Sequence, residues 1–179
     1  EEEVKNAINH VYLNYSRIDV LVNCAGIGYI EEVIHDGHTH DTQKFMNVLN
    51  VNLIGTFLCC KHCAHYMKNN KLYDEERAVI INVASISGSE GTVGQVAYSA
   101  SKGAIMGMSM PMARELYQYK IRVSTISPGP IDTGIKMASY ADKLKEASVV
   151  GRFGYPHEFS MMVIQIIENM YIAGSIIRL

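Results

Sequence analysis

Apolar residues along the chain alternate between two spacings, one typical of amphipathic helices and one typical of buried strands. The helical spacing predicts helices over residues 2–15, 42–68, 97–118 and 157–169. Short, nearly unbroken apolar runs predict strands over residues 18–22, 79–83, 121–126 and 175–179. Because strand and helix alternate with no internal repeat, the pattern predicts an α/β fold with a doubly wound parallel sheet.

Individual residues mark details of these elements. Thr39 or Asp41 is suited to cap the second predicted helix, after a segment over 27–40 that is expected to be irregular. Pro111 is expected to kink the third helix or to open one of its hydrogen bonds. Asn52 interrupts the apolar face of the second helix, where an unpaired amide would be costly. It is therefore either a buried amide satisfied by nearby backbone or a functional residue.

The composition is that of an ordinary globular domain. A chain of 179 residues first indicates one domain, and 48% hydrophobic with 19% charged residues argues against disorder. The net charge of −2 gives no basic excess that would attract nucleic acid or an anionic membrane. No apolar run reaches the roughly 18 residues of a membrane span. We therefore expect no membrane and no direct nucleic-acid partner.

The cysteines form a poor disulfide framework, because Cys59, Cys60 and Cys63 lie close together while Cys24 stands apart. This favours a reducing compartment. A zinc site with His62 lacks a second ligand pair, so helix packing is the better interpretation and no metal is expected. Two further clusters also favour solvation or packing over ligand binding: three loop histidines (His35, His38 and His40) and four helix methionines (Met106, Met108, Met110 and Met112).

Polar residues follow the predicted strands, at the edge where open α/β sheets bind ligands. Ser85 comes directly after the 79–83 strand, and Tyr98 and Lys102 share one face of the next helix at i and i+4. An ammonium beside a phenol is expected to lower the pKa of Tyr98 from about 10 and to make it an acid or base near neutral pH. Isolated Tyr and Lys pairs at this spacing are common, but a Ser at a strand end and the Gly26 turn make the set more specific.

Six motifs occur in the order and with the gaps typical of one family: NCAG, NVNLIGTF, INVASISG, YSASK, SPGPIDT and GRFGYP. Over essentially its whole length the chain resembles the short-chain dehydrogenase/reductase family, which has a Rossmann-like sheet. Within the family it is most similar to the type-2 3-hydroxyacyl-CoA dehydrogenases, also called 17β-hydroxysteroid dehydrogenases type 10. The segments that point to this subgroup are NCAGI, GHTHDTQKF and VGQVAYSASKGAIMGMSMPMAREL, with the ending GSIIRL.

The resemblance implies a catalytic tetrad. Tyr98 would donate or accept the proton, and Lys102 would lower the pKa of Tyr98 and bind the nicotinamide ribose. Ser85 would orient the substrate oxygen. Asn52 would hold the water that relays protons to Lys102.

The resemblance also implies the contacts to cofactor and substrate. The cofactor would be NAD, with NADP as the alternative, and its expected contacts are Asn23, Ala25, Gly26, Tyr98, Lys102, Pro128, Gly129, Ile131 and Thr133. The substrate is expected to meet Ser85, Gln95 and Tyr98. Cys24 replaces the more usual Asn of the family, as it does in the subgroup. Thr92 stands where the subgroup usually has Gln, which puts substrate contacts there in doubt.

The implied function is NAD-dependent interconversion of a secondary alcohol and a ketone, with 3-hydroxyacyl-CoA or a hydroxysteroid as substrate. One alternative is an NADPH-dependent 3-oxoacyl-acyl-carrier-protein reductase. The other is a non-catalytic scaffold subunit of a mitochondrial tRNA-processing complex, which the near-neutral charge does not support. The apolar faces of the two long helices, together with the resemblance, predict a homotetramer. The subgroup suggests the mitochondrion, with the cytoplasm as the alternative.

The motifs change the interpretation of the length. No glycine-rich fingerprint follows a first strand, and the strand over 18–22 corresponds to the family's fourth. We therefore expect the carboxyl-terminal two-thirds of one domain, strands 4 to 7 of the family, with 18–22 as an exposed apolar edge and without tight NAD binding. The substrate lid is expected over 135–150, which matches no recognisable pattern.

Overall fold

The structure of the protein is a computed structural model, which describes residues 1–134 and 148–179. Its helices are α1 (Glu2–Tyr15), α2 (Thr42–Leu49), the π-helical turn η1 (Asn50–Ile54), α3 (Gly55–Met67), α4 (Ser87–Glu90), α5 (Val96–Tyr117) and α7 (Pro156–Glu168). Its strands are β1 (Val20–Asn23), β2 (Ile34–His35), β3 (His38–Thr39), β4 (Ala78–Val83), β5 (Ile121–Ser127) and β6 (Ile176–Arg178). All predicted helices and strands are confirmed to within two residues.

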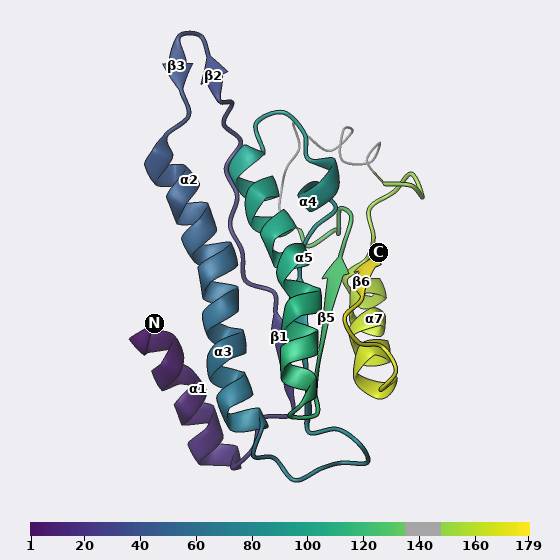
Figure 1. Cartoon of the computed structure of the whole chain (residues 1–179). Helices are drawn as coiled ribbons and strands as arrows, with labels where there is room; N and C mark the ends of the chain where they lie inside the picture. Colours follow the sequence, from purple (N-terminus) through teal and green to yellow (C-terminus); the bar gives the residue numbers. More distant parts are fainter. Residues whose placement is uncertain (135–147) are drawn as a thin grey trace.

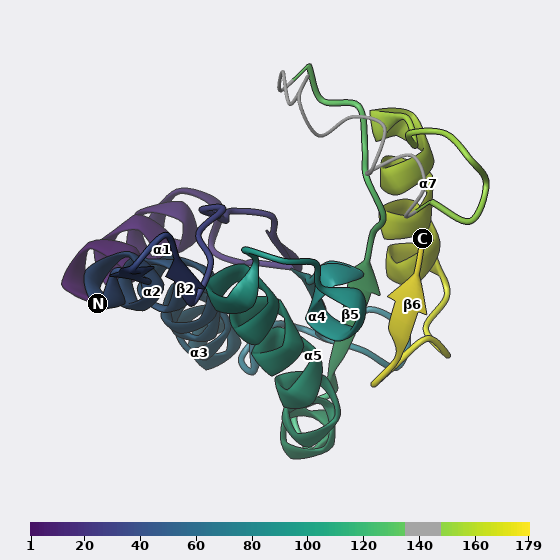
Figure 2. The ribbon, with the colours of Figure 1, turned by 90° about the horizontal axis from the view of Figure 1, so that it is seen from above.

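The main sheet has the order β1-β4-β5-β6, and every pairing in it is parallel. Helices α1, α3 and α5 lie on one face and α7 on the other (Figures 1 and 2). Alternate residues of β4 explain the two layers, since successive side chains of a strand point to opposite faces. Ala78 and Ile80 pack with the first group, whereas Val79 and Ile81 pack with α7. The predicted doubly wound α/β fold is confirmed.

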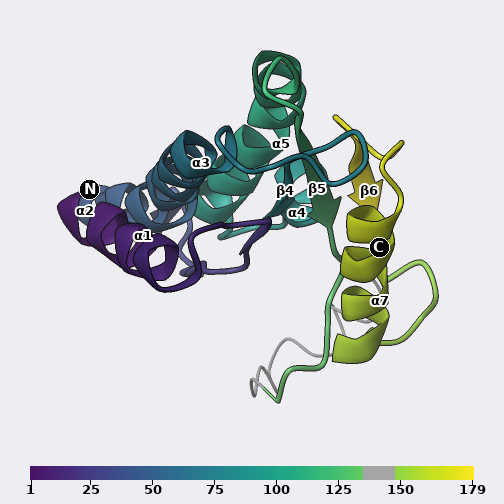
Figure 3. The same cartoon turned by 90° about the horizontal axis from the view of Figure 1, so that it is seen from below.

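In the described part of the chain, β1 is the outermost strand of this sheet, and β6, labelled beside β5 in Figure 3, lies at the other edge. Val20, Leu21 and Val22 are only half-buried there, although each is apolar. The strand predicted over 18–22 is therefore an apolar edge strand, but it is half-buried and not exposed, and Ile18 before it is buried in the core.

The long predicted helix over 42–68 is not a uniform α-helix. Asp41 caps it, with its Oδ1 accepting hydrogen bonds from the backbone N–H of Gln43 (2.7 Å) and Lys44 (3.4 Å). Its middle widens into the π-helical turn η1, which contains Asn52. Such single π turns occur often at functional sites. In contrast, Pro111 lies inside α5 without ending it.

The segment over 27–40 was predicted to be irregular, but it contains the short hairpin β2–β3. Ile34 pairs with Thr39, and the turn residues Asp36 and Gly37 have φ of 48° and 78°. Two consecutive positive φ angles are what a tight hairpin turn needs, and an Asp-Gly pair supplies them at low strain. The Asp-Gly dipeptide was the missed signal. The hairpin projects beyond the sheet at the same end as α4 (Figure 1).

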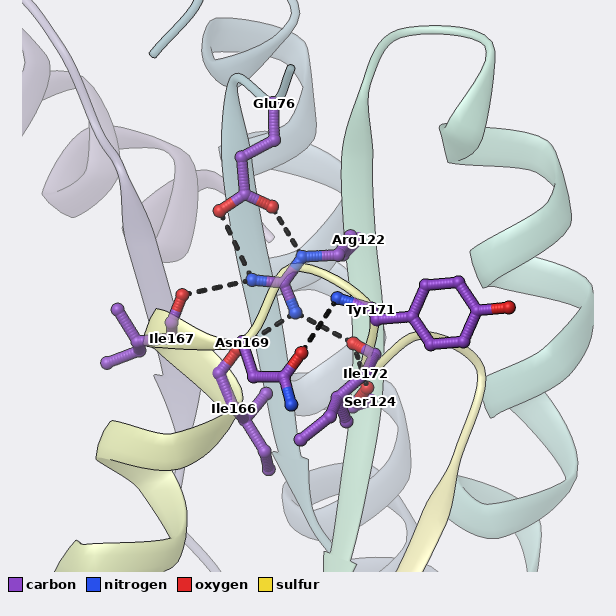
Figure 4. Close-up of polar contacts among 8 residues, drawn as sticks. All are labelled: Glu76, Arg122, Ser124, Ile166, Ile167, Asn169, Tyr171 and Ile172. Atoms are coloured by element: carbon purple, nitrogen blue, oxygen red, sulfur yellow. Dashed lines mark hydrogen bonds and ion pairs between the residues drawn. The ribbon is translucent and has the colours of Figure 1, made fainter. Parts of the chain in front are cut away.

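A buried arginine joins α7 to the start of β5 (Figure 4). The Arg122 guanidinium is 4% exposed and donates to both carboxylate oxygens of Glu76. It also donates to the carbonyls of Ile166 (2.9 Å), Ile167 (3.2 Å) and Ile172 (2.7 Å). These carbonyls belong to the end of α7 and the loop that follows, so Arg122 satisfies groups that a helix end leaves unpaired. The cluster stands at the amino-terminal ends of the parallel strands.

No helix in the described ranges is both long and apolar enough to cross a membrane. The predicted lid falls largely on residues 135–147, which lie outside the described residues.

Candidate active site

The four residues of the predicted tetrad lie together at the carboxyl-terminal ends of β1 and β4, at the other end of the strands from Arg122. Ser85 follows β4, while Tyr98 and Lys102 lie on the first turns of α5. Lys102 Nζ donates to the carbonyl of Val83, the last residue of β4, at 2.8 Å. It also lies 5.6 Å from the ring centroid of Tyr98. The i, i+4 spacing thus places the ammonium and the phenol side by side at the end of one strand.

Asn52 is fully buried and all its amide groups have partners. Its Oδ1 accepts from the backbone N–H of Ile27 at 2.8 Å, and its Nδ2 donates to the Ile27 carbonyl at 2.8 Å. The same Nδ2 donates to Ser101 Oγ at 2.9 Å, and Ser101 Oγ donates to the Tyr98 carbonyl at 2.7 Å. Asn52 therefore ties the loop after β1 to the helix that carries Tyr98 and Lys102. Its side chain is satisfied by the Ile27 backbone, as one of the two interpretations required, and also by the Ser101 hydroxyl.

Glycines let this loop lie directly on the tetrad. A Cβ on Gly26 would stand 3.3 Å from Asn52 Oδ1 and 3.4 Å from Lys102 Nζ. A Cβ on Gly28 would stand 3.2 Å from Cδ2 of Tyr98. The contacts with Asn52 and Tyr98 are tighter than most Cβ contacts, so a side chain at either glycine would have to displace its neighbour by a few tenths of an ångström.

The pKa of Tyr98 differs from the expectation. Burial raises it above the ordinary value of 10.0, and a hydrogen bond with the Ser85 side chain opposes that rise. The predicted net lowering of this pKa is therefore wrong in this structure, because burial has the largest effect on the phenol, and the Lys102 ammonium donates to the Val83 carbonyl. Burial also lowers the pKa of Lys102. Tyr98 is therefore a phenol at neutral pH, ready to donate a proton.

The predicted cofactor contacts have different environments. Ala25 and Gly26 are exposed on the loop, and Thr133 is exposed beyond β5, with Ile131 half-buried between Thr133 and the strand. Pro128 and Gly129 form a turn that is fixed to the chain end, since the Gly129 N–H donates to the Leu179 carbonyl at 2.7 Å. All of these residues follow the carboxyl ends of β1 and β5, where open α/β sheets bind ligands.

Asn23, another predicted cofactor contact, has its side chain engaged inside the protein. Its Nδ2 donates to Asn82 Oδ1 at 2.9 Å and to Cys60 Sγ at 3.3 Å. Only its backbone remains for a cofactor. Sequence reasoning missed this link to Asn82, and it also missed Ser101. The signal for Ser101 was a small polar residue one position before Lys102 on the buried face of α5.

Gln95 lies at the start of α5, half-buried, and its side-chain oxygen accepts from the Thr92 backbone N–H at 3.3 Å. It therefore supports the loop before Tyr98. Whether it meets a substrate stays a prediction.

The predicted cysteine cluster lies on α3, where Cys60 and Cys63 are buried and Cys59 is half-buried. Burial raises the pKa of Cys60 and of Cys63 to about 12, so both are thiols at neutral pH. Within the described residues, no three His, Cys, Asp or Glu side chains are arranged to hold a metal ion.

The chain is similar to known proteins over nearly its whole length. The family described as short chain dehydrogenase matches residues 1–144. The chain is 43% identical to 3-hydroxyacyl-CoA dehydrogenase type-2 of Rattus norvegicus and 41% identical to that of Homo sapiens, covering 100% of itself and 71% of each relative. It is 31% identical to a 3-oxoacyl-[acyl-carrier-protein] reductase of Bos taurus, over 99% of itself and 71% of that protein. The crystal structure of 3-hydroxyacyl-CoA dehydrogenase type-2 from Mycobacterium avium superposes with a TM-score of 0.89 at 29% identity, covering 98% of this chain and 71% of that one.

Proposed function

Because the chain belongs to the short-chain dehydrogenase/reductase family, we propose that it interconverts a secondary alcohol and a ketone with NAD(H), acting on 3-hydroxyacyl thioesters such as 3-hydroxyacyl-CoA. The observation that carries the proposal is the convergence of Tyr98, Lys102, Ser85 and Asn52 at one edge of the sheet. A hydroxysteroid is the second substrate class. The similarity to 3-hydroxyacyl-CoA dehydrogenases type-2 favours the thioester.

The chain's own residues would transfer the proton and position the substrate oxygen. A bound nicotinamide dinucleotide supplies the hydride acceptor for oxidation and the hydride donor for reduction. In reduction, Tyr98 donates its phenolic proton to the developing alkoxide, and in oxidation its phenolate accepts the hydroxyl proton. The hydroxyl of Ser85 donates a hydrogen bond to the same oxygen and holds it beside Tyr98.

The described residues fit such a cofactor. Lys102 is 4% exposed and uses one of its three N–H donors on Val83 in the described part of the chain. The other two would bind ribose hydroxyls, and the ammonium would stabilise a Tyr98 phenolate when one forms. The Ala25–Gly26 backbone and the turn at Pro128 and Gly129, with Thr133, would line the remaining part. Asn52 would hold the proton-relay water indirectly, since its side chain already anchors Ile27.

The proposal is tested by Tyr98→Phe, which removes the proton donor and keeps the ring. With NAD and 3-hydroxybutyryl-CoA, we expect the oxidation rate to fall at least about 100-fold. Circular dichroism should show an unchanged fold. Tyr73→Phe is the matched control, since Tyr73 is 74% exposed in the loop before β4. Activity retained in Tyr98→Phe would overturn the assignment.

The 3-oxoacyl-acyl-carrier-protein reductase is the second candidate, favoured by the 31% identity. It would use the same residues, so the cofactor separates the two. Assays with NADH and NADPH on acetoacetyl-CoA and on an acetoacetyl carrier-protein thioester decide between them. We propose a catalytic role over an RNA-processing scaffold because a net charge of −2 offers no electrostatic basis for RNA contact.

We also propose a homotetramer. A groove of about 330 Å³ lies between α3 and α5, lined mainly by apolar residues that include Phe57, Met108 and Pro111. A second copy packed there would cover that groove. Sedimentation at micromolar concentration that shows only monomer would contradict the tetramer. The mitochondrial compartment stays a prediction, to be tested by imaging the tagged full-length protein.

A further inference from the structure

A fully buried serine lies on α5 between Tyr98 and Lys102, the two residues of that helix in the proposed tetrad. Ser101 is 0% exposed, so its hydroxyl has to find hydrogen-bond partners inside the protein. The hydroxyl accepts from Asn52 Nδ2 at 2.9 Å and donates to the Tyr98 carbonyl at 2.7 Å. One short side chain therefore bonds to two members of the tetrad.

The direction of each hydrogen bond around Ser101 follows from the Ile27 backbone. The Ile27 N–H can only donate, so the Asn52 atom that faces it at 2.8 Å is the oxygen Oδ1. The Asn52 Nδ2 then uses its two hydrogens on the Ile27 carbonyl and on Ser101 Oγ. Because Ser101 accepts from Asn52, its own hydrogen is directed to the Tyr98 carbonyl. A continuous chain of hydrogen bonds thus runs from the loop after β1 to the backbone of Tyr98.

The loop after β1 lies directly against both side chains of α5. A Cβ on Gly26 would stand 3.4 Å from Lys102 Nζ, and a Cβ on Gly28 would stand 3.2 Å from Cδ2 of Tyr98. Packing of this kind limits how near the loop can come to the helix, whereas a hydrogen bond also fixes a distance and a direction. The link through Ser101 therefore holds the loop and the helix in a fixed relative position.

A second buried serine on α5 has a different use. Ser109 is also 0% exposed, and its hydroxyl donates to the carbonyl of Ile105, one turn earlier, at 3.2 Å. Back-bonding of this kind is common for serines in helices. The other partner of Ser109 is the hydroxyl of Thr125 on β5. Ser109 thus joins α5 to the sheet, about 12 Å along the helix from Ser101.

We propose that Ser101 is a positioning residue, which holds Tyr98 and Lys102 in place against the loop at Ile27 through its hydrogen bonds to Asn52 and to the Tyr98 carbonyl. The inference rests on the proposed function and adds a residue that acts on the reaction through others. Proton transfer needs Tyr98 within hydrogen-bond reach of the substrate oxygen. Misplacement by about 1 Å can slow an enzyme about 100-fold, so loss of the link should slow turnover more than it weakens binding.

The test compares Ser101→Ala with Ser109→Ala, since each substitution removes one fully buried hydroxyl from α5. With NAD and 3-hydroxybutyryl-CoA, we expect kcat to fall roughly tenfold in Ser101→Ala, with both KM values within about twofold of those of the unmodified protein. Ser109→Ala should keep its kcat, although both variants should lower the urea midpoint of unfolding by similar amounts. A merely structural role of Ser101 would lower the midpoint and leave kcat unchanged.

Two further comparisons isolate the hydroxyl and its partner. Ser101→Thr keeps a hydroxyl, whereas Ser101→Val has nearly the same shape without one, so kcat of the threonine variant should be severalfold higher than kcat of the valine variant. In the Asn52→Leu background, Ser101→Ala should cause no further fall in kcat, because the link is already broken.

Hydrogen exchange measures the position of the loop without any substrate. The Ile27 N–H, which donates to Asn52 Oδ1, should exchange roughly fivefold faster in Ser101→Ala than in Ser109→Ala.

The outcomes separate this inference from the proposed function. Turnover with equal kcat in Ser101→Ala and Ser109→Ala would overturn the positioning role and leave the proposed function standing. Equal kcat of the threonine and valine variants would also overturn it, as would unchanged exchange at Ile27. No turnover of 3-hydroxybutyryl-CoA by the unmodified protein with NAD or NADP would overturn the proposed function, and this inference with it.

Discussion

The two ends of the sheet each hold a buried cation, and the two cations are used differently. At the amino-terminal ends of the strands, all five N–H groups of Arg122 have an acceptor, two on Glu76 and three on backbone carbonyls (Figure 4). At the carboxyl-terminal ends, Lys102 donates one hydrogen bond in the described part of the chain. Both side chains are 4% exposed.

This difference in hydrogen bonding distinguishes a structural cluster, around Arg122, from a site with donors left for a ligand, around Lys102. A buried charge is tolerated when its hydrogen bonds are complete, and a rigid guanidinium fork achieves this for the end of α7. A buried lysine with unused donors costs stability, because its charge is removed from water without full compensation. The same burial lowers the pKa of Lys102. Such an incomplete buried cation is typical of functional sites.

The largest effect should come from breaking the complete cluster with Arg122→Met. The change leaves Glu76 and three carbonyls without their donor, and loss of one partner of a buried ion pair costs about 3–5 kcal/mol. The measurement is the free energy of unfolding in urea. Arg152→Met is the control, since Arg152 forms an exposed pair with Glu158 and its loss should leave the midpoint nearly unchanged. Equal effects of the two substitutions would mean that the Arg122 cluster is not structural.

A second prediction concerns Asn52, the member of the active-site group whose hydrogen bonds are complete. Asn52→Leu keeps the approximate volume but leaves the N–H and carbonyl of Ile27 unpaired, at a cost of about 2–3 kcal/mol. The loop after β1 should then loosen, so stability and oxidation rate fall together. Asn47→Leu, at an exposed position on α2, is the control. A variant that loses activity at unchanged stability would show that Asn52 acts in the chemistry itself.

Asn52 also shows how far sequence patterns reach. Periodicity predicted the helix around it, the four parallel strands and the covering helices, because burial on both faces of a sheet leaves nearly continuous apolar runs. It could not predict the π turn at Asn50–Ile54, nor the hydrogen bonds of Asn52 with Ile27, a residue 25 positions earlier. The same holds for Asn23, whose partner Asn82 lies on another strand. Tertiary hydrogen bonds set these details.

The prediction for the pKa of Tyr98 was wrong for a related reason. The i, i+4 spacing correctly placed Lys102 beside the ring, but spacing does not report burial or the competing acceptor at Val83. The resemblance to a family identified residues that belong together. Their electrostatics still had to come from the three-dimensional environment.

A third prediction uses that electrostatic environment. Ser85→Ala removes the hydrogen bond that lowers the pKa of Tyr98, so the pKa should rise further. Oxidation needs the phenolate, so its rate should climb toward alkaline pH in the unmodified protein, and the climb should move to higher pH in the variant. The lost contact to the substrate oxygen should also reduce the rate about 100-fold. Ser160→Ala on the exposed side of α7 is the control. An unshifted pH profile would show that Ser85 does not act on Tyr98.

The smallest effect is expected at Cys24, whose pKa responds to the nearby charge of Lys102. Burial raises the pKa of the Cys24 thiol and the nearby Lys102 ammonium partly offsets that rise. In Lys102→Met the pKa of Cys24 should therefore increase, its thiolate fraction should fall, and alkylation by iodoacetamide should slow at fixed pH. Cys59 is the internal control, because burial alone raises its pKa and its rate should not change. Mass spectrometry of the labelled peptides gives both rates from one sample. If Cys24 and Cys59 respond alike, the charge at this end of the sheet is balanced by another group, and Lys102 is as fully compensated as Arg122.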